Sequence, residues 1–223
     1  MRNISVAVDG PAGSGKSTVA KLIAKKMNIV YIDTGAMYRA VGLYCLENGI
    51  DTKNEREVLD ILPKIDLDIK ANSNGQTILL NGVDVTSKVR TQEAGKSASD
   101  VAQILGVREK LVEIQREMAK GTSVIMDGRD IGTNVLPNAD VKIFLNATVL
   151  ERAKRRVGEL QALGETPDLE SIKEQIRKRD ENDINREHNP LRKAEDAFEL
   201  DTTGMTIEEV TEKILSIIEE KVK

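Results

Sequence analysis

The chain has 223 residues, a formal net charge of −4, 39% hydrophobic and 31% charged residues, and 2% aromatic residues. This length fits a single domain with insertions, and the acidic balance and scarce aromatic rings argue against a nucleic-acid surface. Cys45 and His188 are the only residues of their types, which excludes an intramolecular disulfide, a multi-cysteine metal site and a histidine-cluster metal site.

The first apolar run, Ile4–Val8, is rich in β-branched residues and ends at Asp9-Gly10, which predicts a buried strand. It is too short for a signal peptide or a membrane span. We therefore expect a cytoplasmic protein with no membrane partner, no nucleic acid and no obligate protein partner. Helical spacing at 19–27 and again at 37–44 surrounds a second strand at 29–32.

Residues 62–90 show a different pattern. Apolar Ile65, Leu67 and Ile69 alternate with charged residues, and the pairs Asn74-Gly75 and Asn81-Gly82 are typical of hairpin turns. This segment predicts a small antiparallel sheet inserted into the fold.

The rest of the chain again alternates helices and strands. Long helical patterns run through 101–118, without a break that the sequence locates. Strands are expected at 123–126, 141–145 and 197–200, and a capping box at Thr206–Glu209 opens the last helix. Strands that alternate with helices predict an α/β fold, in which a five-stranded parallel sheet is covered by helices on both faces.

The first strand and helix flank Gly10–Ser17, which fits the phosphate-binding pattern G-x-x-x-x-G-K-[ST] without a gap. Glycines let backbone N–H groups surround a phosphate, and the following helix adds its N-terminal dipole. Lys16 is expected to reach the β and γ oxygens, and the Ser17 hydroxyl to bind Mg²⁺. The predicted ATP-binding residues are Gly10, Pro11, Ala12, Gly13, Ser14, Gly15, Lys16, Ser17 and Thr18.

Two classes of P-loop protein compete at this stage. A switch GTPase should carry an Asn-Lys-x-Asp element, and the sequence has none. A kinase needs cations for a second anionic substrate, because the transition state of phosphoryl transfer spreads negative charge over its oxygens. The sequence favours the kinase, with four expected catalytic groups: Lys16, Arg129, Arg179 and Arg186. Arg152, Arg155 and Arg156 fit either this site or a solvated helix face.

Three further segments narrow the assignment: Asp33–Arg39, Arg90–Glu93 and Asp127–Gly132. With these motifs and the spaced residues Arg179, Asp183 and Arg186, the chain resembles the bacterial cytidylate kinases. The resemblance implies transfer of the γ-phosphoryl group of ATP to CMP, and also to dCMP.

The resemblance also implies roles for single residues. Thr34, Arg108 and Asp130 would contact the cytosine, and Tyr38 would help wall the site. Arg39, Arg129, Arg179 and Arg186 would bind the acceptor phosphate. Ser99, Arg179 and Asp183 would lie at the sugar. The family usually has Ser where Thr34 stands.

The base assignment agrees with hydrogen-bond chemistry. A carboxylate suits the N4 amino donor of cytosine, whereas the O4 acceptor of uracil would be repelled by it. The alternatives that the residues leave open are a kinase of UMP, dTMP or shikimate, and a nucleotide-dependent switch.

The resemblance divides the chain into three regions. The core would comprise residues of about 1–33, 121–150 and 191–223, and the acceptor-binding region with the hairpin insert about 34–120. Residues 155–190 are dense in charge and contain the Gly164–Pro167 break, so a mobile lid of two helical arms is expected over about 151–190. Asp127 could support Mg²⁺ in the manner of a Walker B acid, or orient Arg129 or the Lys16 loop.

Overall fold

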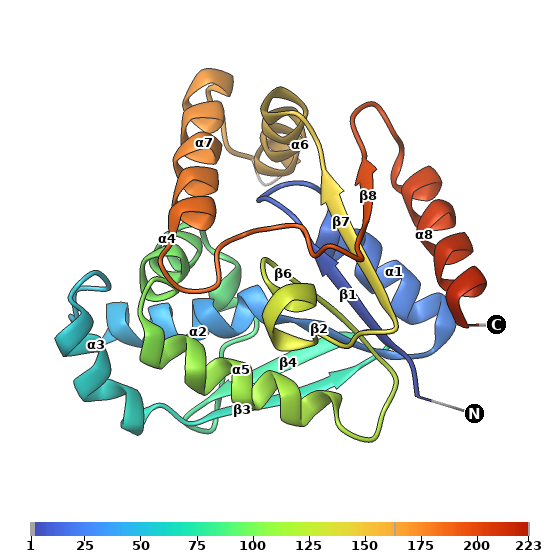
Figure 1. Cartoon of the computed structure of the whole chain (residues 1–223). Coiled ribbons are helices and arrows are strands. Elements are labelled where there is room, and N and C mark those ends of the chain that lie inside the picture. The colour runs from blue at the N-terminus through green and yellow to red at the C-terminus, as the bar shows by residue number, and fades with distance from the viewer. Residues whose placement is uncertain (1–2, 163, 223) are drawn as a thin grey trace.

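The computed structural model describes residues 3–162 and 164–222 as an α/β fold around a five-stranded parallel sheet (Figure 1). The strand order is β2-β6-β1-β7-β8, and every neighbouring pair is parallel. The bounds are β1 Ser5–Asp9, β2 Val30–Asp33, β6 Val124–Gly128, β7 Val141–Asn146 and β8 Phe198–Asp201. The sheet confirms the predicted fold class. Its strands run about one residue further than the apolar runs, because backbone pairing continues through polar residues such as Asp9.

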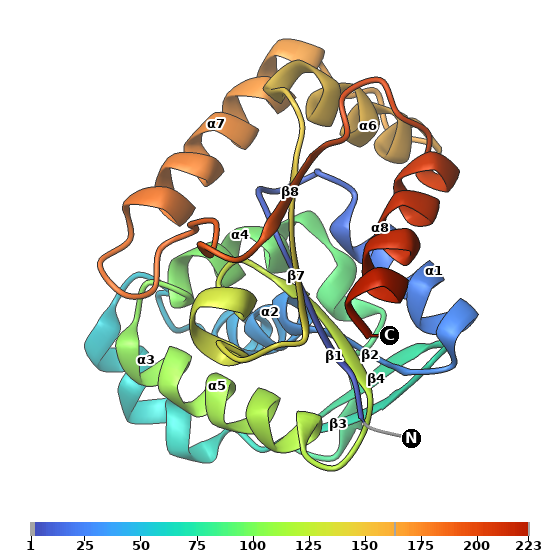
Figure 2. The ribbon, with the colours of Figure 1, turned by 45° about the vertical axis from the view of Figure 1, so that its right-hand side comes forward.

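Helices cover both faces of this sheet, as Figure 2 shows. Val6 and Val8 of β1 pack toward α1 and α8, whereas Ala7 packs on the opposite face toward α5. This alternation follows from the two-residue period of a strand. The bounds are α1 Lys16–Met27, α5 Leu105–Ala119 and α8 Ile207–Val222. The predicted capping box is confirmed: Thr206 N–H donates to Glu209 Oε2, and Glu209 N–H donates back to Thr206 Oγ1.

A second apolar cluster lies beyond the edge strand β2 and contains Cys45, which is fully buried as core packing predicts. Its helices are α2 Thr34–Glu47, α3 Glu55–Ile61 and α4 Gln92–Val101, with one-turn helices η1 Leu62–Lys64 and η2 Lys88–Arg90. The helical pattern expected over 101–118 is divided between α4 and α5. Val101 and Ile104 both point into the core, so the apolar spacing hides the break between them.

The expected inserted sheet is present as three antiparallel strands, β3 Leu67–Asn72, β4 Gly75–Leu80 and β5 Val83–Asp84. Asn81 and Gly82 both have positive φ, +49° and +81°, as a two-residue hairpin turn of type I′ requires. In Figure 1 this sheet lies beside β2. The insert therefore covers the free edge of the main sheet.

The expected two helical arms are α6 Val149–Ala162 and α7 Leu169–Asn185. They pack on each other through their own apolar seam, formed by Ala153, Leu160, Ile172 and Ile176. Residues 1, 2, 163 and 223, which the predicted core and lid include, lie outside the described residues. Within the described ranges, no helix is long and apolar enough to cross a membrane.

Candidate active site

The site lies at the carboxyl ends of the parallel strands, where an open α/β sheet binds its ligands. In Figure 1 the arrowheads of β7 and β8 point toward α6 and α7, which stand over this end of the sheet. The phosphate-binding segment links β1 to α1 at the same end. A π-helical turn, Ile131–Val135, follows β6 there and was not anticipated from the sequence.

The phosphate-binding segment is shaped by close packing at Gly10. A Cβ at this position would lie 2.0 Å from the Leu145 carbonyl oxygen, and the φ of +148° disfavours any side chain. Lys16 is buried, and its Nζ donates to the Pro11 carbonyl oxygen at 2.6 Å. Burial, and then the charge of Arg129, lowers the pKa of Lys16 well below its ordinary value. An anion bound here would relieve both effects.

Ser17 and Asp127 meet beside this segment. Ser17 Oγ donates to Asp127 Oδ2 at 2.7 Å, and the Tyr31 hydroxyl donates to Oδ1 at 2.9 Å. Burial, and then the charge of Asp33, raises the pKa of Asp127 to about 6. Serine and carboxylate oxygens are hard ligands of the kind that Mg²⁺ takes. Of the three roles considered for Asp127, its contact with Ser17 favours support of the ion.

Three guanidinium groups gather between the phosphate-binding segment and α7. Arg129 Nε donates to Asp183 Oδ2 at 2.7 Å. The Nε atoms of Arg39 and Arg179 are buried without a hydrogen-bond partner among the described residues. Burial, and then the charge of Arg129, lowers the pKa of Arg179 to about 10. Buried, mutually repelling cations with free donors make a site for a polyanion.

The residues assigned to the base form a separate cluster around Asp130. Arg108 donates to its Oδ2 at 2.6 Å, Asn134 donates to the same oxygen at 3.1 Å, and Arg186 donates to its Oδ1 at 3.0 Å. Arg186 therefore lies at the base cluster in this structure, whereas its sequence assignment was the acceptor phosphate. The Tyr38 ring lies 5.6 Å from the Arg108 guanidinium carbon and walls the cluster, as expected.

Two other assigned residues lie at the margins of these clusters. Thr34, at the start of α2, donates its hydroxyl to the Asp127 carbonyl oxygen at 2.8 Å. Ser99, on α4, has a buried hydroxyl without a partner among the residues that the structure describes. All the predicted substrate residues thus come from α2, α4, α5, the segment after β6, and α7 with Arg186 directly after its end.

Several residues of the site were missed or undecided from sequence. Arg152 is buried and donates to the Ala12 carbonyl oxygen at 3.0 Å, and Arg155 donates to the Thr202 carbonyl oxygen at 2.7 Å. Asp9 accepts from the N–H groups of Ile131 and Gly132, so it caps the π-helical turn from another strand. No sequence signal identifies this last role, because the partners are 122 and 123 residues apart.

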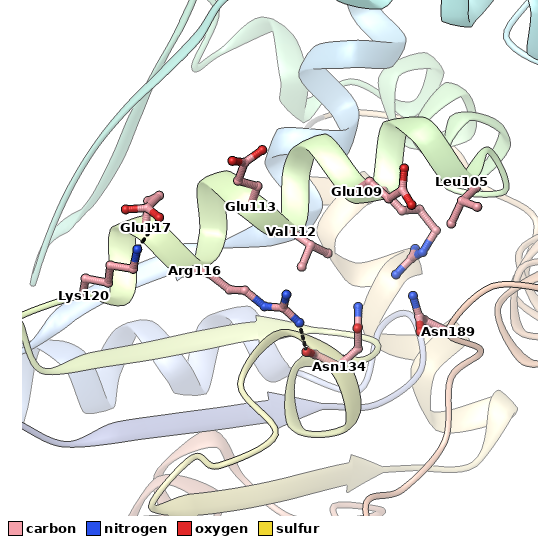
Figure 3. A pocket seen from close by; sticks show the side chains of 10 residues that line it. Leu105, Glu109, Val112, Glu113, Arg116, Glu117, Lys120, Asn134 and Asn189 are labelled. Carbon is pink, nitrogen blue, oxygen red and sulfur yellow. Dashed lines mark hydrogen bonds and ion pairs between the residues drawn. The ribbon is translucent and has the colours of Figure 1, made fainter.

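A groove runs behind the base cluster, between α5 and the π-helical turn (Figure 3). Asn134 and Asn189 face it from one side, and Arg116 reaches from α5 to the Asn134 carbonyl oxygen at 2.6 Å. Acidic Glu117 and basic Lys120 on its rim pair with each other. The groove therefore has no net preference for an anion.

Comparison with known proteins agrees with this geometry. A family model described as cytidylate kinase matches residues 6–220. Cytidylate kinases from Caldicellulosiruptor bescii and Clostridioides difficile are 51% and 53% identical to the chain, over 100% and 98% of its length and 99% of each relative. The cytidylate kinase of Bacillus subtilis is 47% identical, over 99% of this chain and 98% of that relative.

Solved structures share the fold at much lower identity. An uncharacterized protein from Eubacterium ventriosum has a TM-score of 0.56 at 15% identity, covering 98% of this chain and 99% of that one. A gluconokinase from Sinorhizobium meliloti has a TM-score of 0.50 at 14% identity, covering 96% of this chain and 92% of that one. These likenesses concern the fold alone.

Proposed function

Because the chain belongs to the cytidylate kinase family, and is therefore a kinase that phosphorylates CMP with ATP, we propose how its residues carry out this transfer. The observation that carries the proposal is the position of Arg129. Burial, and then the charge of Arg129, lowers the pKa of Lys16, in the donor segment, and of Arg179, in the acceptor cluster. One guanidinium thus lies close to both phosphate sites, where the transferring group must pass.

On the donor side, the backbone of Gly10–Ser17 and the start of α1 bind the phosphates of ATP. Lys16 exchanges its contact with the Pro11 carbonyl for the β and γ oxygens. Ser17, supported by Asp127, would hold Mg²⁺, which would neutralise the charge that develops on the phosphates during transfer.

On the acceptor side, Arg39 and Arg179, whose Nε donors have no partner among the described residues, hold the phosphate of CMP together with Arg129. The acceptor phosphate is largely dianionic at neutral pH, because its second pKa is about 6. It attacks without a general base, so the enzyme acts by positioning and by electrostatic stabilisation. Ser99 and Asp183 lie at the sugar, and dCMP is a second substrate.

Asp130 and Arg108 read the cytosine edge, with Thr34 beside them. Three donors already occupy three of the roughly four lone-pair sites of the Asp130 carboxylate. The remaining site, on Oδ1, accepts from the N4 amino group. All three contacts are donated by N–H groups to the carboxylate oxygens, so the Asp130 carboxylate faces the base as an acceptor and disfavours the O4 acceptor of uracil.

The helices α6 and α7 serve as the lid over about 151–190, and the core and acceptor-binding region keep the bounds given above. Closure of the lid excludes water and so limits hydrolysis of ATP. The nucleotides are the small-molecule partners in this proposal, and the cytoplasm is the place of action.

A coupled ATP-consumption assay with CMP, dCMP, UMP, dTMP and shikimate tests the proposal. We expect turnover with CMP and dCMP and little with the other acceptors. The isosteric variant Asp130→Asn should lower the CMP/UMP ratio of kcat/KM about 5- to 150-fold, since a well-paired base contact contributes about 1–3 kcal/mol of discrimination. An unchanged ratio in a folded variant would exclude Asp130 as the reader of the base.

A further inference from the structure

The side chain of Gln76 on β4 makes a polar contact between the inserted sheet and the main fold. Its Nε2 donates to the Asp33 carbonyl oxygen at 2.9 Å, and its Oε1 accepts from the Asp33 N–H at 2.9 Å. Asp33 is the last residue of β2, an edge strand with no main-sheet partner on this side. The Gln76 amide therefore takes the place of a neighbouring strand at this residue.

Asp33 is also held through its carboxylate. Arg90, which follows the insert, donates to Oδ2 at 2.6 Å, and the Ala36 N–H donates to Oδ1 at 2.9 Å. The second contact is the N-cap of α2. Asp33, between β2 and α2, is thus held at its N–H, its carbonyl and both carboxylate oxygens. Two of the residues that hold it, Gln76 and Arg90, lie in the insert or directly after it.

The helix that Asp33 caps carries much of the acceptor site. Thr34 is its first residue, and Tyr38 and Arg39 lie one turn further on the same helix. A shift of Asp33 therefore moves the start of α2 and the Arg39 guanidinium with it. A displacement of about 1 Å at a reacting group is enough to lower a rate substantially.

We propose that Gln76 is a positioning residue of the acceptor site, through which the inserted sheet fixes Asp33 and hence the start of α2. This inference rests on the proposed role of α2 in binding CMP. Only a side chain with both a donor and an acceptor satisfies both Asp33 groups, and an amide is the group that offers them in this spacing.

Gln76 is separable from the packing of the insert. The insert is anchored by apolar residues such as Ile78 and Leu80, which are 0% and 4% exposed, whereas Gln76 is half-buried. Truncation of Gln76 therefore leaves the apolar anchor in place. Loss of the Gln76 amide leaves the Asp33 N–H and carbonyl without these hydrogen-bond partners.

The test compares Gln76→Ala and the isosteric Gln76→Glu with Thr77→Ala, a neighbouring truncation in the same strand. Initial rates are measured with CMP varied at saturating ATP, and with ATP varied at saturating CMP. For Gln76→Ala we expect KM for CMP to rise about tenfold and KM for ATP to stay within about twofold. Gln76→Glu should raise KM for CMP at least as much, because a carboxylate cannot donate to the Asp33 carbonyl. Thr77→Ala should resemble the parent.

Both Gln76 variants should keep most of the CMP/UMP ratio, because Arg108 and Asp130, which discriminate between the bases, lie on α5 and after β6, and only Thr34 of the base contacts lies on α2. The Gln76 variants are therefore distinguished from Asp130→Asn, because they change KM for CMP, whereas Asp130→Asn changes the CMP/UMP ratio of kcat/KM. Unchanged KM values for CMP, or equal rises in KM for CMP and ATP, would overturn the positioning role. If Gln76→Ala fails to fold, the KM values of Gln76→Glu for CMP and for ATP decide whether Gln76 has the positioning role.

Discussion

Arg152 gives the sharpest test of how the proposed lid, α6 and α7, is attached. Its guanidinium donates to the Ala147 carbonyl at 2.9 Å, to the Ala12 carbonyl at 3.0 Å, and to both oxygens of Asp180 at 3.0 and 2.6 Å. The side chains of Arg152 and Asp180 are only 4% and 14% exposed. One residue thus joins α6, α7, the end of β7 and the phosphate-binding segment.

The magnitude follows from the burial of this pair. Removing one partner of a buried ion pair costs about 3–5 kcal/mol, because the other charge is left uncompensated. For a domain of this size, 1 kcal/mol shifts Tm by about 2–4 °C. Arg152→Met should therefore lower Tm by roughly 6–20 °C in differential scanning calorimetry. ATP affinity should fall as well, because the Ala12 carbonyl loses a donor.

A second variant separates the charge effect from lost packing. Arg152→Met combined with Asp180→Leu removes both charges, and replacement of a whole buried pair by apolar groups is often neutral. The double variant should therefore be more stable than Arg152→Met alone. If the single variant loses less than about 1 kcal/mol, or the double variant is less stable still, the pair does not hold the lid as described.

Three other predictions concern the phosphate-binding segment and its surroundings. Gly10→Ala should abolish ATP binding, measured by calorimetry, because its Cβ would lie 2.0 Å from the Leu145 carbonyl oxygen. The control Gly158→Ala lies in open space on α6 and should raise the free energy of unfolding by up to about 1 kcal/mol. Burial raises the pKa of Asp9 to about 6. The free energy of unfolding of the parent, relative to that of Asp9→Asn, should therefore be greatest near pH 4 and below, and should fall as the pH rises through 6. Urea unfolding of both proteins from pH 4 to 7 measures this difference. A difference that does not change with pH would contradict the prediction. Ser17→Ala should raise the Mg²⁺ concentration for half-maximal rate about tenfold in the coupled assay, and an unchanged value would exclude Ser17 as a ligand.

The sequence predicted the strands and the hairpin turn, because each of them depends on residues that are close together in the chain. The strands around Gly10–Ser17 are short apolar runs, and the hairpin turn at Asn81-Gly82 is set by residues that accept positive φ. The interruption between α4 and α5 was missed, because buried residues continue across it.

The structure brings the expected site residues together, and their roles stay predictions; which of them pair could not be predicted from the sequence. Arg108 and Arg186 were assigned to different parts of the substrate, yet both bind the carboxylate of Asp130. Arg152 fits a solvated helix by its spacing, because nothing local reveals Asp180, which is 28 residues away. Gln76 gave no signal, since an amide that completes an edge strand resembles any other surface glutamine.

The strand order also sets a constraint on synthesis of the chain. The central strand β1 pairs with β6, Ser5 opposite Val124, and the edge strand β2 also pairs with β6. The strand β1 therefore has no strand partner until a segment 119 residues further along has left the ribosome, and β2 waits for the same segment to find its partner in the main sheet. At about 5–20 residues per second, the wait of β1 is about 6–24 s, during which the wholly apolar Val6-Ala7-Val8 lacks its neighbouring strands. The nascent chain is therefore most prone to aggregation just before β6 emerges.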